Sequence, residues 1–174
     1  MWLDPTVDGL KTGHTNGAGY CLVASALRDS TRLVSVILGT QSIKERETQT
    51  AALLNYGFRF FQSVSFFAEG AVIEKARVWK GTAREISIIP AKPVNITVAR
   101  NVAGNLKTDI HIEKPLFAPI SKGQKLGQIQ IKNGDTVIST IDAVAQDDVP
   151  RAGFFGVLWD TLTLLFSRIF GMTV

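Results

Sequence analysis

Two apolar segments near the N-terminus predict buried β-strands. Residues 19–26 and 32–39 are rich in apolar and β-branched side chains, which favour strands. A shorter segment that alternates with polar residues precedes them at 11–15, and the Asn-Gly pair at 16–17 is typical of a hairpin turn. The polar residues 28–30 form a second turn between the two apolar segments. We therefore predict an antiparallel meander of three strands.

Helical spacing begins after the third strand. Ser42 suits the N-cap of a helix, and Glu45 three residues later completes a capping box. Apolar side chains then recur at three- and four-residue spacing, which predicts a helix from about Ile43 to Phe61. Because glycine in a helix costs roughly 1 kcal/mol relative to alanine, Gly57 is expected to have a closely packed neighbour.

Short alternating runs, separated by Gly, Pro and Asn, fill residues 70–149. This pattern is typical of a small all-β domain, and Asn133-Gly134 predicts a hairpin between its last two strands. The predicted strands are 71–79, 85–89, 94–99, 106–112, 125–132 and 136–145.

The C-terminal segment predicts a helix with one heavily apolar face. It is marginal in length for a membrane span, and Asp160 near mid-membrane would cost ~2.5–3.5 kcal/mol. Lying in the plane of the interface leaves that carboxylate hydrated, so we predict an amphipathic anchor. A helix buried against a partner or a second subunit is the alternative. The predicted anchoring residues are Phe155, Leu158, Trp159, Leu162, Leu165, Phe166 and Ile169.

Composition narrows the classes of function. The net charge of +4 over 174 residues comes from scattered lysines and arginines, so no nucleic-acid partner is predicted. The lone Cys21 rules out an intrachain disulfide, and no signal peptide opens the chain. His14 and His111 are the only histidines and have no further ligand at metal-binding spacing, so neither a metal nor a cofactor is predicted.

The triplet Lys11-Thr12-Gly13 has the residue types of an active-site strand. An ammonium group attracts a substrate carboxylate, a hydroxyl hydrogen-bonds it, and a glycine leaves room for the substrate backbone. The next backbone N–H, at His14, can stabilise an oxyanion. On the triplet alone, a polar edge strand with a solvated lysine is the simpler interpretation.

The residues around the triplet carry a family resemblance. The sequence VDGLKTGHT at 7–15, the apolar segments that follow, KERE at 44–47 and NYGFRFF at 55–61 resemble D-alanyl-D-alanine carboxypeptidases, the low-molecular-mass penicillin-binding proteins. The likeness continues more loosely through the β-region and sharpens at FFG, residues 154–156. Enzymes of this family remove the terminal D-alanine from peptidoglycan pentapeptide through a serine acyl-enzyme. Their reaction with β-lactams stops at that acyl-enzyme.

The resemblance also implies roles for individual residues. Lys11, Thr12 and Gly13 correspond to the third catalytic motif of the family, and Lys11, Thr12 and His14 would contact the substrate. Arg46 matches the arginine that holds the substrate carboxylate, which a guanidinium can meet with two parallel hydrogen bonds. Without the resemblance, Arg46 is simply a solvated residue in the first helical turn.

The implied fold is α+β, in three parts. Residues 1–65 would be the last part of a penicillin-recognising peptidase domain, 66–150 a β-rich domain and 151–174 the anchoring helix. The expected location is the periplasmic face of the bacterial inner membrane. The expected partners are peptidoglycan pentapeptide, β-lactams and the lipid surface. A second copy of the chain, in a homodimer, is a further candidate partner.

Two motifs of the family are absent from the sequence. No serine starts a Ser-x-x-Lys or a Ser-x-Asn motif, and in the family both precede Lys-Thr-Gly. The chain is therefore expected to be the C-terminal part of a truncated, split or wrongly started reading frame. It is expected to be inactive alone, with an uncovered apolar sheet face.

Two other functions are weighed against the carboxypeptidase. The first is a non-catalytic, membrane-associated module of the cell envelope. The second is an acyl carrier of the lipoyl or biotinyl type, with Lys132 beside the Asn133-Gly134 turn, although the flanking residues of such carriers are missing.

Overall fold

The computed structural model describes residues 4–169, which divide into two compact units. Unit 1 runs to Val64 and includes Asn95–Gly104. Unit 2 consists of Ser65–Val94 and the chain from Asn105 onward. Residues 95–104 thus return to the unit formed by the first part of the chain. The last five residues of the predicted anchoring segment lie outside the described residues.

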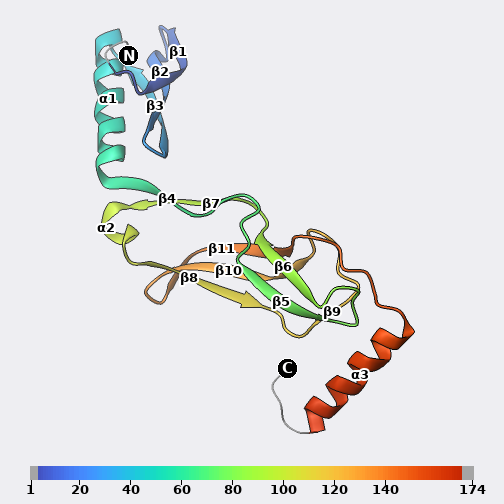
Figure 1. Ribbon diagram of the computed structural model, residues 1–174. Coiled ribbons are helices and arrows are strands. Elements are labelled where there is room, and N and C mark those ends of the chain that lie inside the picture. The colour runs from blue at the N-terminus through green and yellow to red at the C-terminus, as the bar shows by residue number, and fades with distance from the viewer. Residues whose placement is uncertain (1–3, 170–174) are drawn as a thin grey trace. The chain divides into compact units, whose positions relative to one another are not determined.

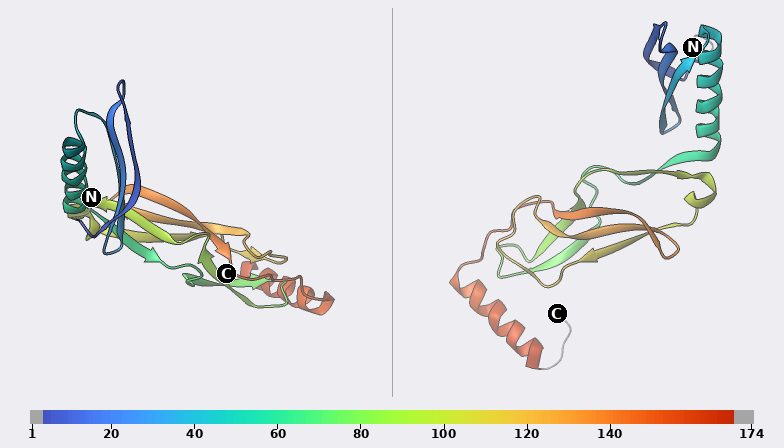
Figure 2. Two further views of the ribbon diagram at one scale, coloured as in Figure 1. Left: turned by 90° about the horizontal axis from the view of Figure 1, so that it is seen from above. Right: turned by 180° about the vertical axis from the view of Figure 1, so that it is seen from behind.

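A three-stranded antiparallel sheet with a helix on one face forms most of unit 1, as Figures 1 and 2 show. The strands lie in the order β1-β2-β3, and buried side chains of β2 pack against the helix α1. The bounds are β1 (Val7–Thr15), β2 (Gly19–Arg28), β3 (Thr31–Thr40) and α1 (Ile43–Phe60). The core between the two layers contains Leu22, Ala24, Ala26, Leu54 and Phe58. The predicted meander and helix are both confirmed.

The ends and the interior of α1 follow from a few residues. The Ser42 hydroxyl accepts a hydrogen bond from the Glu45 N–H at 3.1 Å, as an N-cap does. The Glu45 carboxylate, however, accepts from the Gln41 N–H at 2.8 Å, so the capping box is shifted by one residue. A Cβ at Gly57 would lie 2.5 Å from Leu33 Cδ1, which confirms the close neighbour expected there.

The sheet face opposite α1 carries exposed apolar side chains. Val34, Val36 and Leu38 alternate along β3 and are 54–69% exposed. Among the described strands, β3 pairs with β2 alone, so its outer edge is open as well. An apolar face of this kind was expected from the sequence.

Unit 2 is built on a six-stranded sheet with the order β8-β10-β11-β6-β5-β9. Its pairs are antiparallel except β5 with β9, which is parallel. The strands alternate buried and exposed residues, and Ile88, Ile129 and Ile131 are among the most deeply buried. The bounds are β5 (Glu74–Trp79), β6 (Glu85–Pro90), β8 (Leu106–Ile112), β9 (Leu116–Phe117), β10 (Lys125–Asn133) and β11 (Thr136–Ala145). The predicted β-rich, α+β character is confirmed.

Several elements differ from the predicted ones. Strand β4 (Phe61–Phe67), strand β9 and the short helix α2 (Arg100–Ala103) were not predicted, and β4 pairs with β7 (Val94–Ala99) in a small separate sheet. Strand β5 begins three residues later than expected. The final hairpin turns at residues 134–135, because Asn133 still pairs with Thr136. Gly134, with φ of 58°, occupies the first turn position, where a left-handed backbone favours glycine.

The helix α3 (Phe154–Ile169) ends the described chain and belongs to unit 2. Its inner side is half-buried at Val157, Asp160 and Thr163, whereas the predicted apolar stripe is exposed. The exposed members of that stripe are Phe155, Leu158, Trp159, Leu162, Leu165 and Phe166. Ile169 lies in the helix, but its side chain is outside the described residues.

Candidate active-site strand

The Lys-Thr-Gly triplet lies on β1, at one edge of the unit 1 sheet. Lys11, Thr12, Gly13 and His14 are all exposed. In the described chain β1 pairs only with β2, so its outer backbone edge is open. An open edge can hydrogen-bond an extended peptide laid alongside it. The strand therefore offers an ammonium group, a hydroxyl and an imidazole beside a backbone edge.

The strand register divides these side chains between the two faces of the sheet. Thr12 lies opposite Leu22, which is buried beneath α1, and so Thr12 shares the face that α1 covers. Lys11 lies opposite Val23 and therefore points to the other face. The Lys11 ammonium group donates to the carbonyl oxygen of Thr12 at 3.1 Å and remains exposed.

Arg46 comes from the first part of α1 and reaches the start of β2. Its guanidinium lies 5.8 Å from the centre of the Tyr20 ring, and Nη1 donates to the Cys21 carbonyl oxygen at 3.4 Å. The His14 ring lies 4.0 Å from the same tyrosine ring, centre to centre. Tyr20 thus brings together two of the predicted substrate-binding residues, His14 and Arg46, on the face that also carries Thr12.

Tyr20 was not predicted as part of this site. A signal was available, because the hairpin turn fixes the register and places Tyr20 directly across from His14. The Arg46 contact could not be read in the same way, since Tyr20 and Arg46 belong to different elements. The Arg46 Nε is buried without a hydrogen-bond partner among the described residues.

Two ion pairs near the N-terminus join β1 and the residues before it to β2 and β3. Two hydrogen bonds from Thr6, from its hydroxyl and its backbone N–H, hold the pKa of Asp4 below its ordinary value, and Arg28 adds to this effect. The Arg32 guanidinium donates to Asp8 and lowers the pKa of that carboxyl in the same way. These carboxylates therefore act as structural acceptors.

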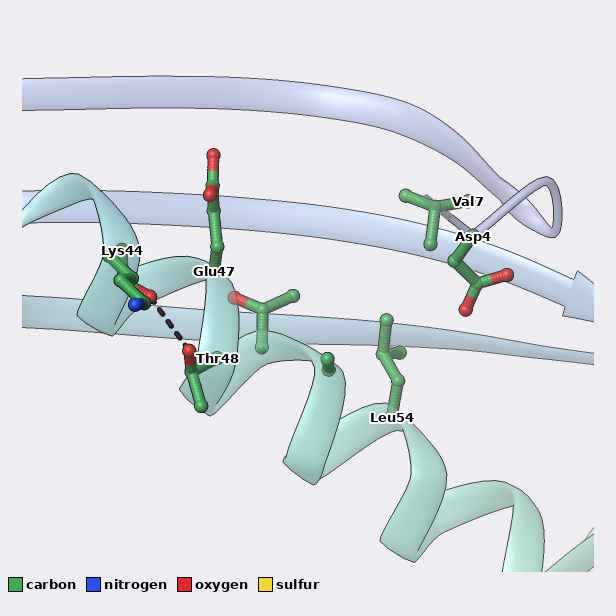
Figure 3. A pocket seen from close by; sticks show the side chains of 8 residues that line it. Asp4, Val7, Lys44, Glu47, Thr48 and Leu54 are labelled. Carbon is green, nitrogen blue, oxygen red and sulfur yellow. Dashed lines mark hydrogen bonds between the residues drawn. The ribbon is translucent and has the colours of Figure 1, made fainter. Parts of the chain in front are cut away.

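A cavity of about 320 Å³ lies between the N-terminal segment and α1. In Figure 3, Lys44, Glu47 and Thr48 of α1 face it from one side, and Asp4 and Val7 line the other. None of the predicted site residues lines this cavity. The chemistry suggested by the triplet therefore belongs to the exposed strand rather than to this cavity.

Other expected or alternative sites can also be placed. Lys132 lies within β10, not at the hairpin tip, and its ammonium group binds Asp109 at 2.6 Å, which lowers the pKa of that carboxyl. This position does not suit an acyl-carrier lysine. Among residues 4–169, no three side chains of the types His, Cys, Asp and Glu gather as metal ligands would.

Known families match the chain in order. The family described as D-alanyl-D-alanine carboxypeptidase matches residues 1–42, and the family described as penicillin-binding protein 5, C-terminal domain, matches residues 61–151. The chain belongs to the penicillin-binding protein 5 family of D-alanyl-D-alanine carboxypeptidases. The resemblance drawn from the residues around Lys-Thr-Gly is thereby confirmed.

Individual members of the family extend the match along the chain. D-alanyl-D-alanine carboxypeptidases DacC and DacA of Escherichia coli K12 are 37% and 36% identical over 166 residues, which are 95% of this chain and 42% and 41% of theirs. The crystal structure of penicillin-binding protein 5 from Haemophilus influenzae superposes with a TM-score of 0.76 at 32% identity, covering 84% of this chain and 43% of that one. The chain thus spans about two fifths of the length of the relatives it matches.

Proposed function

We propose that this chain forms the Lys-Thr-Gly side of the active site of a serine D-Ala-D-Ala carboxypeptidase and the membrane-side part of that enzyme. The reaction is removal of the terminal D-alanine from peptidoglycan pentapeptide through an acyl-enzyme, and β-lactams react at the same site. The main support is that the two families match successive parts of the chain, residues 1–42 and 61–151, and that the triplet lies on an exposed edge strand.

Each site residue has a role in this proposal. The substrate backbone lies along the open edge of β1, beside Gly13, where no side chain blocks it. Thr12 and Arg46 hold the terminal carboxylate from the α1 face of the sheet, and His14 contributes its backbone N–H to the oxyanion site. Lys11 supplies positive potential near the substrate. No Ser-x-x-Lys motif occurs in the 174 residues, so the nucleophile is not in this sequence.

Covalent labelling with a fluorescent penicillin tests this function. The purified chain should show no labelled band near its mass of 18.9 kDa, because acylation needs the missing serine. A chimera in which this chain replaces the matching segment of E. coli DacC should be labelled, and Thr12→Val within it should lower the labelling rate. A folded chimera that takes up no label would contradict the proposed role of β1, and labelling of the chain alone would contradict the need for a second part.

The second part of the proposal concerns the membrane. The exposed apolar stripe of α3 is suited to lie on the periplasmic face of the inner membrane, with its aromatic residues at headgroup level. No helix within residues 4–169 has both the length and the apolar character needed to cross a bilayer. Deleting residues 154–174 should abolish binding to phospholipid vesicles, whereas retained binding would refute the anchor.

A homodimer is the remaining partner in the proposal. The open edge of β3 and its exposed Val34, Val36 and Leu38 offer a surface that two copies can share through antiparallel strand pairing. Light scattering after size exclusion tests this point. Val36→Lys should return a dimer to a monomer, and a wild-type chain that stays monomeric at all concentrations would remove the homodimer from the proposal.

A further inference from the structure

The helix α3 is fastened to unit 2 by a carboxylate on its inner side. Asp160 Oδ2 accepts a hydrogen bond from the backbone N–H of Lys80, with an N···O distance of 2.6 Å. The side chain is half-buried, like Val157 and Thr163 on the same side of the helix. Asp160 is therefore held by the β-domain through a hydrogen bond that the sequence did not predict, while its side chain stays partly exposed.

The residue that receives Asp160 holds the start of α3 as well. The Lys80 carbonyl oxygen accepts from the Ala152 N–H at 2.8 Å, and the neighbouring Gly81 forms a β-bridge with Arg151. Lys80 has a φ of 60°, a left-handed conformation that non-glycine residues adopt where the surrounding structure imposes it. The backbone of Lys80 and Gly81 thus contacts both the segment that precedes α3 and the helix itself.

The orientation that results is opposite to the one water favours. An amphipathic helix on a soluble domain normally turns its apolar face inward, because burial removes apolar surface from water. Here Phe155 is 83% exposed and Trp159 is 69% exposed, while the charged Asp160 faces the domain. Rolling the helix to bury the stripe would detach Asp160 from Lys80.

We propose that Asp160 is a positioning residue that locks α3 on unit 2 with its apolar face outward, so that a lipid bilayer meets a preformed docking face. The inference rests on the membrane role proposed above and adds the device that presents the face. Without the lock, α3 turns its stripe onto the β-domain, and this surface must be released again before the bilayer can bind it. Asp160 thereby increases bilayer affinity without contacting lipid.

Amide hydrogen exchange and vesicle binding test the lock together. Asp160→Ala removes the acceptor, and the Lys80 amide should exchange about tenfold faster, equivalent to 1.4 kcal/mol. Asp160→Asn keeps a carbonyl oxygen and should restore part of the protection. Thr161→Ala is the matched control, since Thr161 is exposed and its hydroxyl donates to the Val157 carbonyl oxygen within the helix. That control should leave exchange at Lys80 unchanged.

Affinity for phosphatidylethanolamine–phosphatidylglycerol vesicles should fall about tenfold in Asp160→Ala, again equivalent to 1.4 kcal/mol, and less in Asp160→Asn. The thermal midpoint of unit 2 should stay close to that of the wild type in both. Unchanged exchange at Lys80 in Asp160→Ala overturns the lock, and so does unchanged vesicle affinity. A wild-type chain that does not bind vesicles, but whose Lys80 exchange depends on Asp160, refutes the membrane role and leaves the lock as a purely structural contact.

Discussion

Shortening the apolar side chains of α3 should weaken bilayer binding by an amount set by their exposure. Only the exposed fraction of a side chain leaves water when the helix docks. Full burial of a large apolar side chain contributes about 1.5–3 kcal/mol. Phe155, at 83% exposed, should therefore contribute about 1.2–2.5 kcal/mol. Leu162, at 43% exposed, should contribute about 0.6–1.3 kcal/mol.

These energies translate into measurable affinity losses. Phe155→Ala should bind vesicles roughly seven- to seventyfold more weakly, and Leu162→Ala roughly three- to ninefold. Ile138→Ala is a close control, because Ile138 is also an aliphatic side chain of four carbons and is 42% exposed, but lies on β11. Co-flotation over a lipid concentration series gives the three affinities.

Two results would refute a role of the exposed α3 stripe in bilayer binding. If Ile138→Ala weakens binding as much as Leu162→Ala, the chain adheres to lipid through general surface hydrophobicity rather than through α3. If Phe155→Ala binds like the wild type, the exposed stripe does not enter the bilayer. Circular dichroism on each variant confirms that the fold is retained.

Gly57→Ala should destabilise unit 1 by up to about 2 kcal/mol, because overpacking against Leu33 outweighs the helix propensity gained. In a Leu33→Ala background the same change should stabilise unit 1 by up to about 1 kcal/mol. If urea titrations show that Gly57→Ala changes stability in the same direction in both backgrounds, the contact with Leu33 is contradicted. The lowered pKa of Asp4 means that its contribution is complete above the ordinary carboxyl pKa and is lost as the pH falls below about 4. The gap in urea midpoint between wild type and Asp4→Asn should therefore close on acidification, and a gap independent of pH would refute this. Arg100→Ala should lower the free energy of unfolding by about 1 kcal/mol, a value that allows for the exposure of the arginine side chain, because Arg100 donates to the Phe58 carbonyl oxygen near the end of α1. An unchanged unfolding midpoint would show that this hydrogen bond does not stabilise unit 1.

Local signals predicted the elements that begin and end at a recognisable residue. Ser42 marks the start of α1, and the polar turns mark the ends of β2 and β10. Strand β4 was missed because Phe61 both ends α1 and opens the strand, with no glycine or proline between them. Strand β9 has only two residues, Leu116–Phe117, too few for a period to be seen.

The candidate site was predictable only where the sequence neighbours are also neighbours in space. The register of β1 and β2 follows from the short hairpin loop, which assigns Thr12 and His14 to one face. Contacts such as Asp160 with Lys80 join residues far apart in the chain, and no pattern in either segment indicates the other. The expectation of a hydrated carboxylate at Asp160 did not include this hydrogen bond, which the Lys80 backbone N–H donates from the β-domain.

The opposite surroundings of two tryptophans give unit 2 a pair of built-in optical probes. Trp79 is 3% exposed and lies beneath the Arg77 guanidinium, 3.7 Å from the ring centre, so its emission should be blue-shifted and should report unfolding of the sheet. Trp159 is 69% exposed on the stripe of α3, so its emission should be red-shifted in water. In a Trp2→Phe background, which removes the third tryptophan of the sequence, entry of α3 into a bilayer should shift only the Trp159 emission, and unfolding of the sheet should shift the Trp79 emission.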